Sequence, residues 1–388
     1  MRILLVTEAS SAGVGRHVID LCGALVARNH DVHLVYATGR IDDAFAGGVH
    51  ALDSRKALST AIIEMRRGPH PSDRGALRAL ANHAATHGPF DIVHGQSSKG
   101  GGLARLLRGR HGTENAATVY TPHCIYTLNP EGSWLKRALF GRAELWLARR
   151  TDAIIAVSPS EARHLEELGM PPDLVHCVPN GIARPELPSK AEARGALGLP
   201  SDALIVGFLA RLSPQKNPLL AIEAFARVAQ KHRAVHLAFA GTGALEGACR
   251  ELAASRGITD RIHWLGYGRP GTLLPASDVF ALSSEYEGMP YVYLEALVAG
   301  LPIVTTDVGG AELAIEEGIN GFVVPRGDPD SFAAALDRVL SDEALRRRMA
   351  MASSARADRF DDTHMVEGTV AVYEAALARK RAREASRP

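Results

Sequence analysis

The sequence has few of the features that mark disulfide-bonded, zinc-bound or membrane-spanning proteins. Its four cysteines, at positions 22, 124, 177 and 249, form neither a Cys-x-x-Cys pair nor an evenly spaced framework. This argues against a structural zinc site and against a disulfide scaffold. No window approaches 18 consecutive apolar residues, so we expect no segment to cross a bilayer.

An excess of charge of one sign is also absent. The 44 lysines and arginines nearly balance the 43 aspartates and glutamates, and a formal net charge of +1 argues against a chain that mainly binds nucleic acid. The N-terminus carries one positive charge and a short apolar run, which is typical of a buried strand rather than of a signal peptide. With the cysteine pattern, this predicts a cytoplasmic protein.

Short apolar runs alternate with helical patterns along the whole chain. The runs show little polar alternation, which predicts parallel strands buried on both faces of doubly wound α/β sheets. The expected strands are 3–7, 32–36, 91–94, 117–120, 153–157 and 175–178, then 204–209, 235–240, 261–265, 279–282, 303–305 and 321–324. Between the two series lies a stretch rich in proline and charge. The 388 residues therefore predict two α/β domains, 1–182 and 183–358, followed by a helical segment at 359–388.

A stretch of small residues directly follows the first expected strand. Gly13 and Gly15, in Ser-Ser-Ala-Gly-Val-Gly-Arg, would let the backbone approach a ligand, and the following helix N-terminus would favour an anion. A tight turn without a ligand would need the same glycines, so both interpretations stay open. A full Gly-x-Gly-x-x-Gly is absent, which argues against NAD.

Two cations follow the strand expected at 204–209. Arg211 and Lys216 stand at the carboxyl end of that strand, which is the edge where open α/β sheets bind ligands. Two fixed cations there could hold a diphosphate. Two solvated loop charges would give the same pattern.

Two glutamates flank an expected helix N-terminus near Pro290. Glu287 and Glu295 have seven residues between them, and the free N–H groups of the helix N-terminus can receive phosphate oxygens. A sugar nucleotide has a matching layout, with hydroxyls on both sides of a diphosphate. This segment predicts a sugar-nucleotide site.

Four motifs in order resemble those of family 4 retaining glycosyltransferases with the GT-B fold, such as the bacterial polysaccharide and glycolipid enzymes of the group 1 type. The motifs are Gly13-Val14-Gly15, Val178-Pro179-Asn180-Gly181, Ala210-Arg211-Leu212 with Lys216, and Glu287 with Glu295. The chain departs from the family pattern at Ala210, where glycine is usual, and at Met289-Pro290, where phenylalanine-glycine is more common.

The resemblance implies a role for each matched residue. Arg211 and Lys216 would bind the donor diphosphate and stabilise the departing charge, without a metal or cofactor. Glu287 would contact the donor sugar and Glu295 the ribose hydroxyls. The other implied donor contacts are Gly13, Gly15, Asn180, Gly288, Met289 and Tyr291.

His123, in Tyr120-Thr-Pro-His-Cys, matches the family histidine that reaches into the cleft between the domains, where it could hydrogen-bond a donor-sugar hydroxyl or the reacting centre. We expect it to act with Arg211, Lys216 and Glu287 as the catalytic set. The alternative is a loop histidine packed against Tyr126.

The resemblance also implies an architecture and a reaction. Two Rossmann-like domains would face a central cleft, with 1–182 binding the acceptor, 183–358 binding the donor, and 359–388 crossing back to the first domain. The reaction would move a hexosyl group from a UDP- or GDP-sugar to a hydroxyl of a lipid-linked or polysaccharide precursor, with retained configuration. A nucleotide-sugar epimerase and a non-catalytic sugar-nucleotide-binding protein are the alternatives.

The segment 133–150 contains five basic residues, one acid and apolar residues at roughly helical spacing. Such a helix could rest on an anionic membrane surface, which would place the protein at the inner face of the membrane. An ordinary domain helix that buries one apolar stripe has the same composition.

Overall fold

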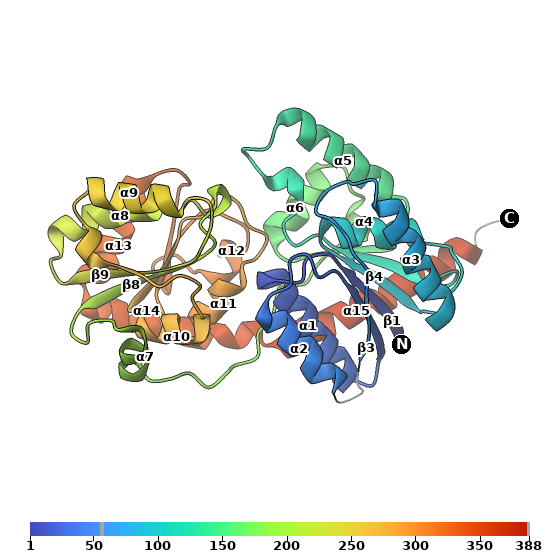
Figure 1. The fold of residues 1–388 in the computed structure, drawn as a ribbon, viewed down its shortest axis with the longest axis horizontal. Helices are drawn as coiled ribbons and strands as arrows, with labels where there is room; N and C mark the ends of the chain where they lie inside the picture. The colour runs from blue at the N-terminus through green and yellow to red at the C-terminus, as the bar shows by residue number, and fades with distance from the viewer. Residues whose placement is uncertain (55–57, 386–388) are drawn as a thin grey trace. The chain divides into compact units, whose positions relative to one another are not determined.

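The structure, a computed structural model, describes residues 1–54 and 58–385, which form two compact units (Figure 1). The first contains residues 1–181 and the chain from 362 onward, and the second contains 182–361. The division lies one residue from the boundary expected after residue 182. The segment expected at 359–388 joins the first unit from residue 362, and its last three residues lie outside the described part.

The first unit is built on a parallel sheet of seven strands. Their order is β3-β2-β1-β4-β5-β6-β7. The strands are β1 (Arg2–Thr7), β2 (Asp31–Tyr36), β3 (Ser59–Ile62), β4 (Ile92–Gln96), β5 (Ala117–Thr121), β6 (Ala153–Ala156) and β7 (Val175–Cys177). The helices are α1 (Ala12–Ala27), α2 (Asp43–Asp53), α3 (Asp73–His87), α4 (Ser97–Leu107), α5 (Trp134–Ala148), α6 (Pro159–Glu167) and α15 (Asp362–Ala385), with short 3-10 turns η1 (Tyr126–Leu128) and η2 (Pro172–Leu174).

Both faces of this sheet are buried. Ile3 and Leu5 of β1 pack with α1 and α15 on one face, whereas Leu4 and Val6 pack with α3 and α4 on the other. Successive side chains of a strand point to opposite faces, so a strand covered on both sides reads as an unbroken apolar run. This is why six of the seven strands were predictable.

Strand β3 was not predicted. Its residues, Ser-Thr-Ala-Ile, are only partly buried or exposed, and they pair with β2 at the edge of the sheet. An edge strand with small polar residues carries neither the apolar run nor the alternation that identifies a strand.

The second unit has a parallel sheet of six strands. Their order is β10-β9-β8-β11-β12-β13. The strands are β8 (Leu204–Leu209), β9 (Val235–Ala240), β10 (Ile262–Trp264), β11 (Val279–Leu282), β12 (Ile303–Thr306) and β13 (Gly321–Val324). The helices are α7 (Lys190–Leu197), α8 (Pro218–Lys231), α9 (Glu246–Ser255), α10 (Pro270–Ala276), α11 (Tyr291–Val298), α12 (Ala311–Ala314), α13 (Pro329–Ser341) and α14 (Glu343–Arg356), with η3 (Pro214–Lys216), η4 (Thr259–Arg261) and η5 (Ala357–Phe360).

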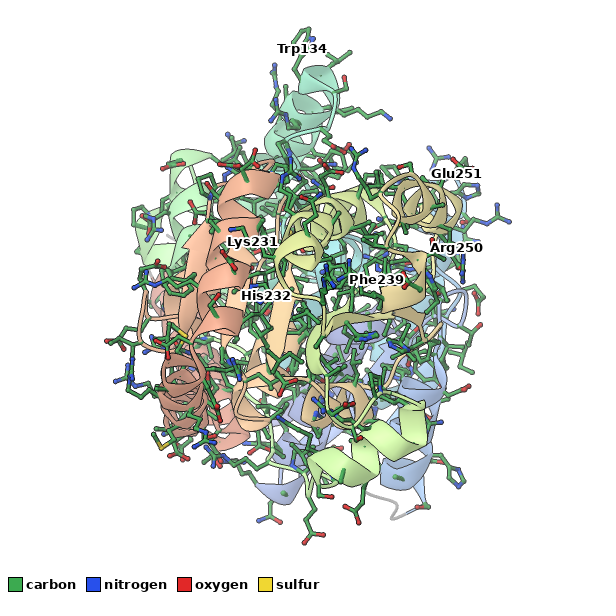
Figure 2. All side chains as sticks on the ribbon, turned by 90° about the vertical axis from the view of Figure 1, so that its left-hand side faces the viewer. Trp134, Lys231, His232, Phe239, Arg250 and Glu251 are labelled. Carbon is green, nitrogen blue, oxygen red and sulfur yellow. The ribbon has the colours of Figure 1, made fainter. Side chains whose placement is uncertain are left out.

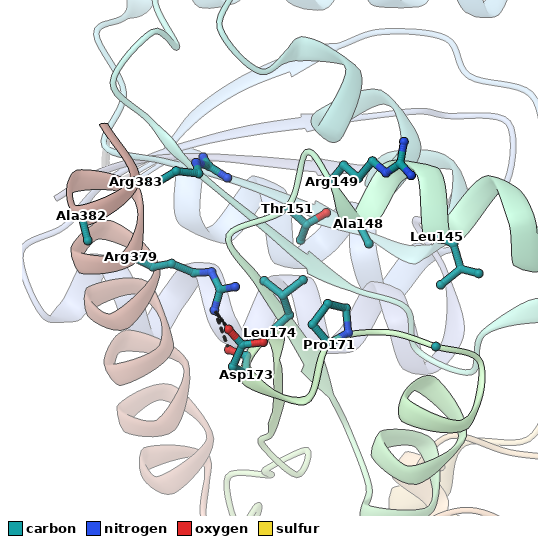
Figure 3. Close-up of a pocket in the computed structure, with 11 residues that line it drawn as sticks. Leu145, Ala148, Arg149, Thr151, Pro171, Asp173, Leu174, Arg379, Ala382 and Arg383 are labelled. Atoms are coloured by element: carbon teal, nitrogen blue, oxygen red, sulfur yellow. Dashed lines mark hydrogen bonds and ion pairs between the residues drawn. The ribbon is translucent and has the colours of Figure 1, made fainter. Parts of the chain in front are cut away.

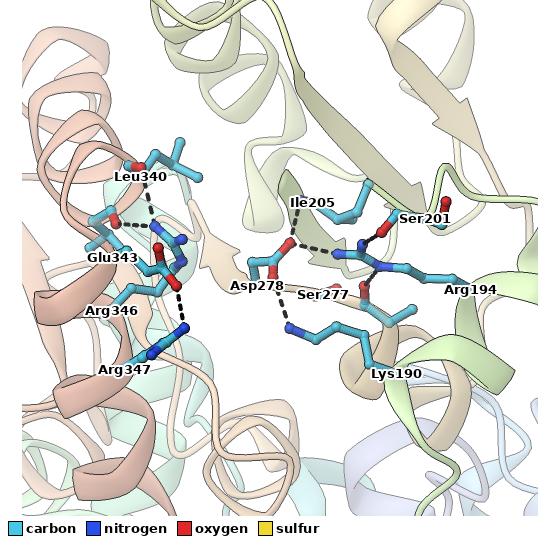
Figure 4. A network of polar contacts seen from close by, with 12 residues as sticks. Lys190, Arg194, Ser201, Ile205, Ser277, Asp278, Leu340, Glu343, Arg346 and Arg347 are labelled. Carbon is cyan, nitrogen blue, oxygen red and sulfur yellow. Dashed lines mark hydrogen bonds and ion pairs between the residues drawn. The ribbon is translucent and has the colours of Figure 1, made fainter. Parts of the chain in front are cut away.

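One carboxylate ties together the amino ends of the two central strands of this sheet (Figure 4). Asp278, which directly precedes β11, accepts hydrogen bonds from the Ile205 N–H of β8 and from the Arg194 guanidinium, both at 2.7 Å. Lys190 adds a third contact at 2.8 Å. Strands β8 and β11 are thereby held side by side, together with α7.

Candidate functional site

The order of the six-stranded sheet places its ligand edge between β8 and β11. The chain runs outward from β8 toward β10 and returns through β11 toward β13, so the connections after these two strands diverge. Open α/β sheets bind ligands in the crevice that such a reversal leaves at the carboxyl ends. The loop after β8 carries Arg211 and Lys216, and the loop after β11 carries Glu287.

Lys216 and Glu287 form an ion pair across this crevice, although they are 71 residues apart in sequence. Their side chains are only 15% and 7% exposed. The Ser284 hydroxyl donates a second hydrogen bond to the same carboxylate oxygen of Glu287, at 2.7 Å. A cation and an anion with little access to water therefore stand together at the ligand edge.

Further contacts join the β8 and β11 loops. The Gln215 amide donates to the Tyr286 carbonyl at 3.1 Å, and its backbone carbonyl accepts from the Glu285 N–H at 2.8 Å. The Arg211 guanidinium donates to the Gln215 side chain at 3.4 Å. Asn217, which caps α8 by accepting from the Leu220 N–H, donates its amide to Glu285 at 2.5 Å. These bonds fix the backbone from which Arg211 and Lys216 project.

A third loop packs against the arginine loop through glycine. Gly241 and Gly243, after β9, have φ of +151° and +157°. A β-carbon on Gly241 would lie 1.9 Å from the Ala210 carbonyl oxygen, and one on Gly243 would lie 2.3 Å from that of Leu212. Any side chain at either position would displace the backbone on both sides of Arg211.

The segment after Glu287 leads into α11. Gly288 and Met289 are buried, α11 begins at Tyr291 with Pro290 as its N-cap, and Glu295 is the fifth residue of the helix. The helix start expected near Pro290 is thus confirmed.

In the seven-stranded sheet the corresponding reversal lies between β1 and β4. Gly13 and Gly15 belong to the first turn of α1, which begins at Ala12. A β-carbon on Gly15 would lie 3.0 Å from the Ser10 carbonyl carbon, so this glycine allows the close approach of helix and loop.

Asn180 is 3% exposed, and its Oδ1 accepts a hydrogen bond of 3.1 Å from His17 Nδ1 on α1. The pair therefore joins the end of the first series of strands to α1.

His123 lies just beyond β5 in a strained backbone conformation. Its φ is +53°, and that of the next residue, Cys124, is +78°. Such left-handed values cost non-glycine residues about 1–3 kcal/mol each and persist only where the surroundings enforce them. Here the buried carboxylate of Glu161 accepts from the backbone N–H groups of Cys124 and Ile125, at 2.7 and 3.1 Å. These two bonds stabilise the strained turn.

The imidazole of His123 and those of its neighbours His17 and His94 are neutral at physiological pH. Burial lowers the pKa of His17 to about 4 and the pKa of His94 to about 3. Burial, helped by the nearby His17 and His94, holds the pKa of His123 well below its ordinary value. The His17 and His123 rings meet edge to face, with centroids 4.4 Å apart. A neutral imidazole can accept a hydrogen bond, which an imidazolium cannot.

A cavity of about 820 Å³ lies elsewhere in the first unit, between the end of α5, η2 and α15 (Figure 3). Thr151 and Leu174, which line it, precede β6 and β7, so it lies at the opposite edge of the sheet from His123. Two of its arginines, Arg379 and Arg383, form ion pairs with Asp173 and Asp152.

Residues 1–54 and 58–385 show neither a metal-binding cluster nor a membrane-spanning helix. No group of three or more His, Cys, Asp or Glu side chains in these ranges could hold a metal ion. None of the helices in them is long and apolar enough to span a membrane.

Comparison with known proteins identifies the family. The family described as "Glycosyl transferases group 1" matches residues 189–356, and "Glycosyltransferase Family 4" matches residues 11–184. The D-inositol 3-phosphate glycosyltransferase of Acidothermus cellulolyticus is 31% identical over 398 residues, which covers 96% of this chain and 87% of that protein. The chain belongs to the family 4, group 1 glycosyltransferases. The putative glycosyltransferase EpsD of Bacillus subtilis is 30% identical, over 81% of this chain and 84% of EpsD.

Solved structures show the same fold as this glycosyltransferase. HepE of Anabaena, solved in complex with UDP-glucose, matches with a TM-score of 0.80 at 21% identity, over 97% of this chain and all of that chain. Sucrose-phosphate synthase of Thermosynechococcus elongatus matches with a TM-score of 0.81 at 19% identity, over 97% and 99%. The fold is GT-B, as expected. Membership in this family decides against the epimerase and non-catalytic alternatives.

The structure places the expected site residues of the glycosyltransferase in two groups. Arg211, Lys216 and Glu287 meet at the β8–β11 edge of the second unit, which also contains Gly288, Met289, Tyr291 and Glu295. The first unit contains Gly13, Gly15, Asn180 and His123. His123 and Asn180 are joined through His17. His123 therefore lies in a polar cluster, whereas the alternative expected it to pack against Tyr126.

The sequence did not indicate several residues that hold the site loops of the glycosyltransferase in place. Gln215 joins the β8 and β11 loops, Ser284 donates a hydrogen bond to Glu287 within the β11 loop, and Glu161 holds the turn after His123. The contacts of Glu161 with the turn and of Gln215 with Tyr286 span 36 to 71 residues, whereas Ser284 lies three residues before its partner Glu287. Only Ser284 could have been found by a local pattern, as a hydroxyl beside a candidate carboxylate.

Proposed function

We propose that this chain transfers a hexosyl group from a nucleoside diphosphate sugar to a hydroxyl acceptor, with retention of configuration. The observation that carries the proposal is the buried Lys216–Glu287 pair beside Arg211 at the reversal of the six-stranded sheet. The bond from the anomeric carbon to the diphosphate oxygen breaks, and a bond to the acceptor oxygen forms on the same face of the sugar. The acceptor proton passes to the departing diphosphate.

In this proposal each charged residue has one task. Arg211 and Lys216 stabilise the negative charge that develops on the departing diphosphate, in a site with little water, where fixed charges act most strongly. Glu287 accepts hydrogen bonds from hydroxyls of the donor sugar, and Glu295 from those of the ribose. His123 accepts a hydrogen bond from a hydroxyl of a bound sugar. Gly13, Gly15, Asn180 and the segment 288–291 complete the donor contacts.

We propose a UDP- or GDP-sugar as the donor, supported by the relatives solved with UDP and UDP-glucose. The test is a thermal-shift panel with UDP, GDP, ADP, TDP and their sugars. A ligand that binds the folded state raises its free energy of unfolding by RT ln(1 + [L]/Kd), so the melting temperature should rise with UDP or GDP concentration. Unchanged melting with all eight ligands would contradict a donor site.

We propose that no metal takes part, because two cations already stand at the expected diphosphate. The chain has one Asp-x-Asp triplet, Asp328-Pro329-Asp330, of a kind that could hold a divalent ion. Asp328 instead caps α13 by accepting from two backbone N–H groups, and Asp330 pairs with Arg227 at 2.8 Å. We expect transfer rates in EDTA and in magnesium to agree within about twofold, since the two cations already supply the charge.

The two glutamates should separate binding from turnover. We expect Glu295→Ala to raise the Kd of the free nucleotide about 10-fold or more, since one charged hydrogen bond contributes about 1.5–3 kcal/mol. Glu287→Ala should leave the Kd of the free nucleotide nearly unchanged and lower kcat. Calorimetric titration of both variants with the nucleotide identified by the panel, beside steady-state kinetics, provides the measurement. Equal affinities of wild type and Glu295→Ala would contradict the assignment.

We propose a lipid-linked or polysaccharide precursor as the acceptor, met at an anionic membrane surface through α5. Trp134, Leu135, Leu139 and Trp146 of this helix are 48–74% exposed, and Figure 2 shows Trp134 at the projecting end of the helix. The inner side of α5 carries Gly141, Glu144 and Ala148, so the exposed apolar residues are not the stripe that packs on the sheet.

The charges of this helix suit an anionic surface. Its one acid, Glu144, is buried in an ion pair with Arg105. The basic residues of 133–150 are exposed or partly exposed, so the surface of the helix carries positive charge. The Arg150 guanidinium lies 4.9 Å from the Trp146 ring centroid. Apolar side chains flanked by cations are the pattern of a helix that lies in the headgroup region.

We expect the double variant Trp134→Ser/Leu139→Ser to lose at least about 10-fold in binding to anionic phosphatidylglycerol vesicles, because each side chain contributes about 1.5–3 kcal/mol when buried. Sedimentation with these vesicles, compared with neutral phosphatidylcholine, measures the effect. Tyr267→Ser, which alters a 72% exposed aromatic residue of the other unit, is the control. Wild-type protein that stays in the supernatant with both lipids would disprove the membrane contact.

A further inference from the structure

A chain of buried polar side chains lies behind His123. Tyr373 of α15 contacts His94 Nδ1 through its hydroxyl at 2.7 Å, and Thr121 contacts His94 Nε2 at 2.8 Å. The Gln96 amide nitrogen lies 3.2 Å from His94 Nε2, and the Gln96 amide oxygen lies 2.6 Å from His123 Nε2. Tyr373, His94, Thr121 and Gln96 are all fully buried, whereas His123 is partly exposed.

The contact with Gln96 determines which nitrogen of His123 carries hydrogen. An amide oxygen can only accept a hydrogen bond, so the His123 nitrogen that faces it, Nε2, must donate. In a neutral imidazole only one nitrogen bears hydrogen, so Nδ1 then has a free lone pair. Within residues 1–54 and 58–385, Nδ1 of His123 has no hydrogen-bond partner.

We propose that Gln96 is a positioning residue that holds His123 as the Nε2–H tautomer and so presents Nδ1 as a hydrogen-bond acceptor to a sugar hydroxyl. This inference rests on the proposed function, in which His123 contacts a bound sugar. Gln96 itself touches no substrate. It acts through the ring that it orients.

The structure gives the Gln96 amide one orientation, in which its oxygen faces His123 Nε2 and its nitrogen faces His94 Nε2. If the amide rotated by 180°, its NH2 group would face the His123 nitrogen and its oxygen would face His94. Both His94 nitrogens already have partners in Tyr373 and Thr121, so the His94 ring is fixed on two sides. The strained turn at 123–124 is held separately by Glu161, so the ring and the backbone of His123 are supported by different residues.

The charged and titratable groups around His123 come from four different elements. They are His17 from α1, His94 from β4, Tyr373 from α15 and Glu161 from α6. Neither Gln96 nor the adjoining Thr121 carries a charge. A new carboxylate at position 96 would thus be the first anion in direct contact with the His123 ring among the described residues.

Two substitutions at Gln96 test the proposal through pH profiles and kinetic constants. Gln96→Glu keeps an acceptor oxygen and adds a negative charge, which favours the imidazolium form of His123. We expect the acid limb of its kcat/KM profile to move to higher pH by about one unit or more. Gln96→Met keeps the length and removes the acceptor, so we expect kcat to fall about 10-fold or more with the donor KM within about threefold.

Melting temperature and nucleotide binding show whether each variant is folded. If Gln96→Met does not fold, the acid limb of Gln96→Glu decides alone. An acid limb in Gln96→Glu that coincides with that of wild type would overturn the proposal, as would full kcat in a folded Gln96→Met.

His123→Ala, measured in parallel, separates this inference from the proposed function. Wild-type turnover in His123→Ala would contradict the role of His123 and, with it, the inference. A large loss in His123→Ala with no effect of either Gln96 substitution would overturn the inference alone.

Discussion

Replacing Lys216 by alanine should lower kcat/KM by about 10²- to 10³-fold, which is the loss seen when one preorganised hydrogen-bond donor is removed from a developing anion. Lys216 is 15% exposed and contacts a carboxylate that is 7% exposed, so water cannot substitute for the ammonium group. The loss should fall mainly on kcat, because the charge on the diphosphate grows as the sugar leaves. Initial rates over a range of donor concentrations separate the two constants.

The matched control is Lys231→Ala. Lys231 lies in the same unit and also pairs with a carboxylate, Asp337 at 2.7 Å, but its side chain is 66% exposed. We expect its kcat/KM to stay within about twofold of wild type, because exposed ion pairs contribute little. Similar constants for Lys216→Ala and Lys231→Ala would show that the buried pair takes no part in transfer.

Replacing Glu144 by alanine should lower the free energy of unfolding of the first unit by about 3–5 kcal/mol, the usual cost of leaving one member of a buried ion pair alone. Arg105 is fully buried, and its guanidinium contacts Glu144 at 2.7 Å and lies 3.9 Å from the Tyr120 ring centroid. Among residues 1–54 and 58–385, the charge would without Glu144 keep only the Gly101 carbonyl, at 2.9 Å, as a hydrogen-bond acceptor.

The tryptophans allow this loss to be measured in the correct unit. Trp134 and Trp146 lie on α5, and the third tryptophan, Trp264, lies in the second unit. In a Trp264→Phe background, urea unfolding followed by fluorescence reports the first unit alone. His111→Ala, which removes the exposed contact with Glu114 in the same unit, is the control and should cost less than about 1 kcal/mol. A loss of that small size in Glu144→Ala would mean that the buried pair contributes no net stability.

The architecture was largely predictable because parallel strands buried on both faces leave apolar runs in the sequence. The same reasoning placed Arg211, Lys216 and Glu287 at one edge, since the carboxyl ends of parallel strands lie together. Two features of the first unit could not be predicted, and each has a physical reason. Strand β3 has no apolar run. Helix α1 begins at Ala12 with a φ of +51°, which no local sequence pattern indicates.

The supporting contacts could not be predicted from local patterns. Gln96 and His123 are 27 residues apart, and Tyr373 lies 279 residues from its partner His94. Such pairs arise from the order of strands in the sheet and from the return of α15 to the first unit. A glutamine at a strand end or a tyrosine within a helix carries no sign of its partner.

The return of α15 also affects the order in which the chain can fold. Val366, Val372 and Tyr373 complete the core on one face of the seven-stranded sheet, together with Ile3 and Leu5 of β1. The second unit is contiguous in sequence, so all of its strands exist before residue 362 has been synthesised. During synthesis the second unit is therefore able to fold first. Until α15 has been made, the first unit keeps one apolar face of its sheet uncovered. That face would therefore be open to aggregation for the whole of this interval.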